Sequence, residues 1–282
     1  MTFSIVARSE DGESWGVAVA SKFFAVGSAV PAAVAGVGAI ATQADVNVTF
    51  KFVGLGLLDD GATADVALAR LLEDDERPDE RQVGIVDGEG QAASHTGRDC
   101  FPWAGGRTGP GYAIQGNLLV GPGVLDAIED AWLTGAGTPF ARRLLAALAA
   151  GDAAGGDRRG RQSAALLVVR DGAGHGGGDD VAVDLRVDDH HAPVTELARL
   201  LDLNDLYLTA PDDTDKVPLD DALLDELAVR AVEAGHEHLR AWVASENFEN
   251  RVAPGLRPKW IDSRVLDILR GSTHPSQLKE HR

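Results

Sequence analysis

The sequence is poor in sulfur, tyrosine and lysine. Its 282 residues include one cysteine, one methionine, two tyrosines and five lysines. A lone cysteine, Cys100, excludes an intramolecular disulfide and a cysteine-rich metal site. No apolar run approaches the ~20 residues that cross a bilayer, so we expect no membrane-spanning helix. The N-terminus has no basic segment followed by an apolar one, so we expect no signal peptide and a cytoplasmic location.

The charge balance is strongly acidic. There are 44 acidic and 26 basic residues, which gives a formal net charge of −18. Nucleic acids and anionic membranes bind through lysine and arginine clusters, so neither is expected as a partner. Because salt screens repulsion between surface carboxylates, this balance is typical of a salt-rich, halophilic cytoplasm.

Short apolar runs alternate with turn signals along most of the chain. The predicted strands are residues 3–8, 15–20, 37–42, 82–86, 91–95, 112–119, 164–170 and 181–187. Helices are predicted from about Thr63 and over 123–134, 138–150 and about 193–203. Tight turns rather than helical crossovers join neighbouring strands, which disfavours a doubly wound parallel sheet. We predict an α+β fold with two mainly antiparallel sheets, covered by helices on both outer faces.

The composition changes near residue 205. A polar stretch that contains prolines, 206–218, is predicted to be a linker after a first domain of residues 1–205. Helical patterns over 219–250 and about 262–270 then predict a small all-helical domain, 219–282.

Thr2 is the first candidate for chemistry. A strand is predicted to begin directly after Met1, and removal of Met1 would leave Thr2 with a free α-amine. The hydroxyl of an N-terminal threonine can attack a carbonyl while its own amine accepts the proton. That amine has an ordinary pKa of about 7.7–8.0, close to a working pH. The alternative is an ordinary N-terminal residue at the edge of a strand.

Two further residues could support such a nucleophile. Asn117 follows Gly116, and an asparagine amide with a nearby backbone N–H can stabilise an oxyanion. Lys22 follows a predicted strand and could lower the pKa of the nucleophile or hold a substrate carboxylate. The alternatives are a turn at Gly116–Asn117 and a lysine that only extends from a strand end into solvent.

Other polar residues have less specific signals. His95 could be a general base, line a pocket or simply end its strand, and Cys100 beside Phe101 and Trp103 is interpreted as a buried thiol. The arginine-rich segment GGDRRGRQ is typical of a loop that holds a substrate carboxylate, with phosphate binding as the competing interpretation. The run DDHH cannot converge on one ion because adjacent side chains of an extended segment point to opposite sides. We therefore expect no metal site.

The motifs together resemble those of one family. MTFSIVAR, WGVAVASKFFAVGSAVP, GVGAIATQA, AASHTG, CFPWAG, YAIQGNLL, GGDRRGRQSAALLVVR and VDLRVDDH closely resemble the DUF1028 family, in register from residue 1 to about 205. The resemblance implies the four-layer αββα sandwich of N-terminal nucleophile (Ntn) hydrolases. The segment ENFENRVAPGLRPKWIDSRVLDILRG resembles the peptidoglycan-binding-like domain that often follows DUF1028. Three small packed helices can also serve as an interaction or dimerisation module.

The leading hypothesis is therefore an Ntn amidohydrolase that acts on a small amide or peptide-like substrate. Thr2, Lys22 and Asn117 are the expected catalytic residues. The residues expected to bind the substrate are Ser21, Thr42, Gln43, His95, Arg107 and Arg158. No cofactor is expected, and homo-oligomer formation is left open. The alternative is a non-catalytic binding protein on the same scaffold, since a fold does not imply a function.

Overall fold

The computed structural model describes residues 2–271, which form two compact units that divide between Ala198 and Arg199. The division falls inside helix α6 (Pro193–Tyr207) rather than within residues 206–218. That stretch contains a 3-10 turn and strand β11 (Lys216–Pro218), so part of it is regular structure. In the described part of the chain, no helix is both long and apolar enough to cross a membrane.

The first unit contains a six-stranded antiparallel sheet with β1 and β2 near its centre. The strand order is β10 (Val181–Val187), β9 (Ser163–Arg170), β2 (Ser14–Ser21), β1 (Thr2–Arg8), β8 (Tyr112–Asn117) and β7 (Gly105–Gly109). Strands β1 and β2 form a hairpin whose turn contains Gly12 at φ +76°, a conformation that favours glycine. Thr2 therefore begins a strand that is paired on both sides.

A second antiparallel sheet has four strands. Their order is β3 (Pro31–Val34), β4 (Gly38–Ala44), β5 (Arg81–Asp87) and β6 (Ala92–Thr96). The Asp87 carboxylate closes the β5–β6 turn by accepting the backbone N–H groups of Glu89 and Gln91 at 3.0 and 2.9 Å. This confirms the tight turn and antiparallel pairing expected for the predicted strands 82–86 and 91–95.

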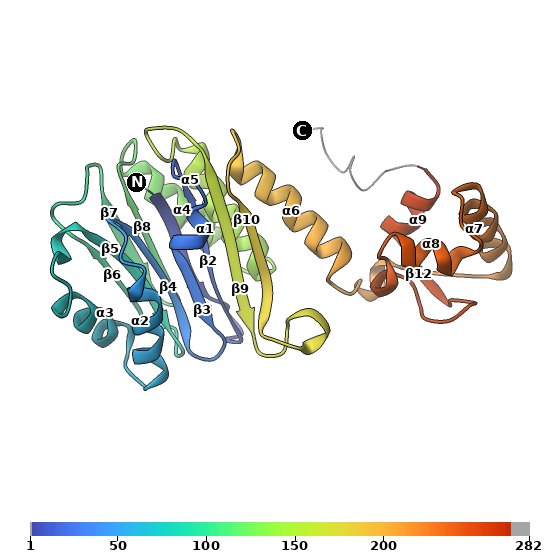
Figure 1. Ribbon diagram of the computed structural model, residues 1–282, viewed down its shortest axis with the longest axis horizontal. Coiled ribbons are helices and arrows are strands. Elements are labelled where there is room, and N and C mark those ends of the chain that lie inside the picture. Colours follow the sequence, from blue (N-terminus) through green and yellow to red (C-terminus); the bar gives the residue numbers. More distant parts are fainter. Residues whose placement is uncertain (1, 272–282) are drawn as a thin grey trace. The chain divides into compact units, whose positions relative to one another are not determined.

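The two sheets pack face to face, with helices on their outer faces (Figure 1). Strand β1 contacts β4, and β8 contacts β5. Helices α4 (Gly123–Thr134) and α5 (Phe140–Ala153) cover the six-stranded sheet, while α2 (Thr49–Asp59) and α3 (Ala64–Glu73) cover the other. A short helix, α1 (Val26–Ala29), follows β2. The mixed α/β class with antiparallel sheets is thus confirmed.

The layer between the sheets changes character along β1. Val6 belongs to an apolar cluster that also contains Val17, Ala39 and Val86. Closer to Thr2, the residues that face the other sheet are hydroxyl and amide side chains, all of them buried. Burial of polar groups is costly unless they are hydrogen-bonded, and these side chains form a network in which Gln115 Oε1 has no partner among the described residues.

Gly84 lets the sheets approach closely at this network. A Cβ atom there would lie 2.0 Å from Oε1 of Gln115, which is fully buried in the facing sheet. We expect Gly84→Ala to destabilise the protein by about 1–3 kcal/mol, because overpacking forces neighbours to shift. Urea unfolding of the full chain measures this free energy. Gly56→Ala, at a site with open space, is the control and should cost much less.

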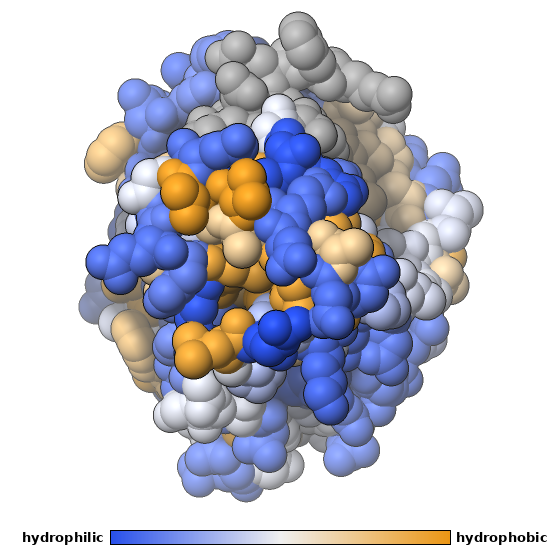
Figure 2. Space-filling view, turned by 90° about the vertical axis from the view of Figure 1, so that its right-hand side faces the viewer, coloured by the Kyte–Doolittle hydropathy of each residue, from blue (hydrophilic) through white to orange (hydrophobic). Residues whose placement is uncertain are grey.

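The second unit is small and contains both helices and strands. Helices α7 (Asp221–Glu233), α8 (Leu239–Ser245) and α9 (Ser263–Leu269) accompany an antiparallel pair of strands, β11 with β12 (Trp260–Asp262). The expectation of an all-helical domain is therefore wrong. Each strand has only three residues, too few for an alternating pattern to be recognised. Figure 2 looks onto this unit and shows several small apolar groups separated by hydrophilic side chains.

Candidate functional site

Thr2 occupies a buried position at the start of β1. Thr2 is only 5% exposed, and its Oγ1 lies 3.2 Å from Oγ of Ser21 on β2. On the other side, Thr2 is directly opposite Asn117 on β8. The structure thus brings together three residues predicted to act at the site, from three adjacent strands.

A chain of side-chain amides surrounds Thr2. Gln43 Nε2 donates to the Thr2 carbonyl oxygen at 3.3 Å and to Gln82 Oε1 at 2.8 Å. Asn117 Nδ2 donates to the same Gln82 oxygen at 2.8 Å. Gln43 and Gln82 are a cross-strand pair on β4 and β5. The four-stranded sheet therefore orients groups that belong to the six-stranded one.

The same layer contains a second amide. Gln115 Nε2 donates to Ser4 Oγ at 2.6 Å, and Ser4 donates to Gln43 Oε1 at 2.7 Å. Ser4, Gln82 and Gln115 were not expected from the sequence. Ser4 and Gln115 each lie two residues from a candidate on the same strand, Thr2 on β1 and Asn117 on β8, so a polar residue repeated at i and i+2 in an otherwise apolar strand could have found them. Gln82 has no such polar neighbour on β5. Every side chain named in this network is neutral.

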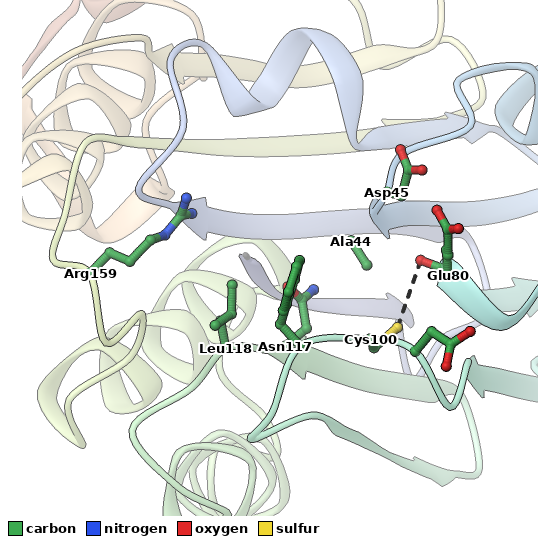
Figure 3. Close-up of a pocket in the computed structure, with 9 residues that line it drawn as sticks. Ala44, Asp45, Glu80, Cys100, Asn117, Leu118 and Arg159 are labelled. Atoms are coloured by element: carbon green, nitrogen blue, oxygen red, sulfur yellow. Dashed lines mark hydrogen bonds between the residues drawn. The ribbon is translucent and has the colours of Figure 1, made fainter.

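A cavity of about 540 Å³ opens beside Asn117. Its lining residues are Ala44, Asp45, Glu80, Asp99, Cys100, Phe101, Asn117, Leu118 and Arg159. Figure 3 shows Asn117 between Arg159 on one side and Cys100 on the other. Ala44 and Leu118 have φ values of +70° and +51°, and such strained backbone is concentrated at functional sites.

Ion pairs offset much of the charge around this cavity. Arg77 lies 2.8 Å from both Asp45 Oδ2 and Glu80 Oε2. Arg159 pairs at 3.3 Å with Asp157, whose carboxylate is almost fully buried. Burial raises the pKa of the Cys100 thiol, and Asp99 adds to that shift. A thiol with a raised pKa is a poor nucleophile, consistent with the interpretation of Cys100 as structural.

Lys22 was expected to act on the nucleophile or on a substrate carboxylate, but its side chain is not directed to Thr2. Its backbone N–H donates to Asp157 Oδ2 at 2.7 Å, while its side chain is exposed. The residue therefore helps to fix the chain after β2, and no contact between its ammonium group and Thr2 occurs within residues 2–271. The proposed tuning of Thr2 by Lys22 thus stays a prediction without geometric support.

Thr42 and His95 face away from the amide network. Side chains alternate along a strand, and their neighbours Gln43 and Thr96 point toward the facing sheet. Thr42 Oγ1 instead donates to the Asn47 carbonyl at 3.3 Å, and His95 Nε2 lies 2.9 Å from the Pro78 carbonyl. Both side chains are engaged in fixing loops on the helix-covered side.

The structure does not bring the two predicted substrate-binding arginines to this site. Arg107 pairs with Asp126 at 2.8 Å and lies 3.9 Å from Glu129, both on α4. Arg158 has an exposed side chain, and its backbone N–H donates to the Leu118 carbonyl at 3.2 Å. The neighbouring Arg159, which the sequence analysis did not select, is the arginine that lines the cavity.

No group of three or more potential metal ligands gathers in the part of the chain that the structure describes. The rings of His190 and His191 are tilted by 42° with centroids 4.3 Å apart, and His190 Nδ1 accepts the Ala192 N–H at 3.1 Å. These histidines thus order the turn that follows β10.

Comparisons with known proteins identify the family. The model of DUF1028, described as a family of unknown function, matches residues 2–197. The chain is also similar to the crystal structure of protein SPO2555 from Silicibacter pomeroyi, with 30% sequence identity and a TM-score of 0.66. That match covers 77% of this chain and 95% of the other. No curated protein matches. The chain therefore belongs to the DUF1028 family.

Proposed function

We propose that this protein is an Ntn amidohydrolase that cleaves a small amide or peptide-like substrate after removal of Met1. The facing sheets with helices on both outer sides would then be the four-layer αββα sandwich of that class. Met1 lies outside the described residues. The observation that carries the proposal is the position of Thr2, whose hydroxyl faces a polar layer between two sheets in register with Asn117.

The chemistry follows from the groups at Thr2. Its Oγ1 attacks the carbonyl carbon of the amide, and its α-amine accepts the hydroxyl proton. The C–N bond then breaks, and the departing amine takes that proton. Water hydrolyses the resulting ester of Thr2 and restores the free hydroxyl. Ser21 Oγ, at 3.2 Å, orients the Thr2 hydroxyl during attack.

Asn117 supplies the oxyanion donor. A primary amide carries two N–H donors, and the structure assigns one of them to Gln82. The second remains for the tetrahedral intermediate. The backbone N–H of Leu118 already donates to the Phe101 carbonyl at 2.9 Å, so it does not contribute. The adjoining cavity accommodates the rest of the substrate.

Asn117→Ala is expected to lower kcat of amide hydrolysis by about 10²–10³-fold, the usual effect of losing one oxyanion donor. Steady-state kinetics measure this loss, and KM should change little because the donor acts mainly in the transition state. Arg107→Ala is the matched control, since Arg107 pairs with α4 away from the site. Equal kinetics for Asn117→Ala and wild type would exclude this role.

The direct test of the function is a screen of small amides and short peptide amides, each assayed with wild type and with Thr2→Ala. Turnover by wild type alone supports the proposal. Turnover by both proteins would show that another residue performs the chemistry. Binding without turnover would favour the alternative, a non-catalytic binding protein in which the buried amide network is purely structural.

For the C-terminal unit, we propose an interaction or dimerisation module similar to the peptidoglycan-binding-like domain. Its folded core of Leu227, Trp242, Phe248 and Ile261 supports an independent unit. The cytoplasmic location and the absence of nucleic-acid and membrane partners also stay predictions from composition.

A further inference from the structure

Gln82 is a buried residue with contacts to both sides of the proposed active site. It is fully buried on β5, and its Oε1 accepts from Gln43 Nε2 and Asn117 Nδ2, each at 2.8 Å. Through Gln43 this one oxygen is linked to the Thr2 carbonyl. A single amide group therefore connects the proposed nucleophile with the proposed oxyanion donor.

The orientation of the Gln82 amide is determined by its other end. Its Nε2 lies within hydrogen-bonding distance of three acceptors, which share its two N–H groups: Thr96 Oγ1 at 2.9 Å, the Gly105 carbonyl at 3.1 Å and the Gly116 carbonyl at 2.8 Å. Carbonyl oxygens can only accept, so the nitrogen must face them and the oxygen must face Asn117. Gly116 directly precedes Asn117, so Gln82 holds both the backbone and the side chain there.

We infer that Gln82 is a positioning residue that fixes the Asn117 amide so that its free N–H points at the reacting carbonyl. This inference rests on the proposed function. Since a misplacement of about 1 Å can cost on the order of 10²-fold in rate, a buried residue that holds a catalytic amide matters even without touching substrate.

The test uses Gln82→Met, which keeps the length of the side chain and removes its oxygen and its amide donor. The matched control is Gln115→Met. Gln115 is equally buried in the same layer, but its hydrogen bond goes to Ser4 rather than directly to Thr2 or Asn117. The probe is a β-lactone, which acylates a reactive threonine hydroxyl, with labelling of Thr2 followed by intact mass.

We expect Gln82→Met to slow labelling of Thr2 by about 10²-fold, and Gln115→Met to leave it within a few-fold of wild type. The double variant, Gln82→Met with Asn117→Ala, should be labelled no more slowly than Asn117→Ala alone, because Gln82 acts through Asn117. Gln82 would have a merely structural role if its effect and that of Asn117→Ala on the labelling rate multiplied in the double variant. An equal loss of labelling rate in Gln115→Met would show the same. If Gln82→Met fails to fold, Thr96→Val removes one partner of Nε2 and should give a smaller loss.

A second readout does not depend on catalysis. The readout is the NMR signal of the Asn117 side-chain NH₂ group, which is assigned by its loss in Asn117→Ala. In wild type the protons of this group should exchange slowly with solvent. Gln82→Met should abolish that protection, and Gln115→Met should not. Unchanged protection in Gln82→Met overturns the inference. A wild-type protein that the lactone does not label, but whose Asn117 signal responds in this way, refutes the proposed function and leaves Gln82 as the group that orients Asn117.

Discussion

Thr2→Ala is expected to reduce amide hydrolysis on the order of 10⁴–10⁶-fold, the usual loss when a nucleophile is removed. The alanine variant keeps a small second residue, so its Met1 should be removed as in wild type. Thr2→Ser should retain measurable activity, because it preserves the hydroxyl and the amine. Steady-state rates of the three proteins, with near-identical circular dichroism spectra, measure the effect.

A further variant separates the amine from the hydroxyl. Inserting one alanine between Met1 and Thr2 keeps the threonine hydroxyl but converts its amine into a peptide nitrogen. The variant with the inserted alanine should be as inactive as Thr2→Ala, because the α-amine that accepts the hydroxyl proton is lost. Full activity in the inserted chain would mean that another group is the base.

Asp262→Asn is expected to destabilise the C-terminal unit by about 3–5 kcal/mol, since it leaves a buried cation unpaired. Arg251 Nη1 lies 2.7 Å from Asp262 Oδ2, and the two side chains are 2% and 0% exposed. The pKa of Arg251 is lowered, chiefly by burial, and the Asp262 carboxylate opposes that shift. Asp262 also caps α9 by accepting the Arg264 N–H at 2.8 Å.

Hydrogen exchange of the full chain, read by mass spectrometry, measures this effect locally. Peptides from 239–271 should lose protection, and peptides from β1 and β2 should not. The control is Asp221→Asn, which removes an exposed ion pair with Arg257 and should cost less than about 1 kcal/mol. Similar protection in both variants would contradict the importance of the buried pair.

Much of the first unit could be predicted from local pattern. The hairpins around Gly12 and Gly90 have clear turn signals between apolar runs, and the strands formed where expected. The missed elements have weak signals. Helix α2 has the sequence TFKFVGLGLLD, with apolar residues on nearly every side, and β7 has the glycine-rich sequence GGRTG. Their structure depends on packing against the neighbouring sheet rather than on periodicity.

The site could be predicted only in part. Thr2, Ser21, Gln43 and Asn117 meet because β1, β2, β4 and β8 are neighbours, and all four strands were predicted from apolar runs and motifs. Gln82 was missed because its importance comes from the contact between the two sheets, which no local pattern reports. Arg107 was selected for its charge, but partners on α4 take it away from the site. Only the three-dimensional arrangement shows that Arg159 rather than Arg107 lines the cavity.

The role of Thr2 as nucleophile is tested by the intact mass of the purified protein before and after exposure to a β-lactone. We expect a mass that lacks Met1, followed by addition of one label that peptide mapping places on Thr2. Complete retention of Met1 in protein that hydrolyses amides would contradict this role, because the Thr2 amine would then be blocked.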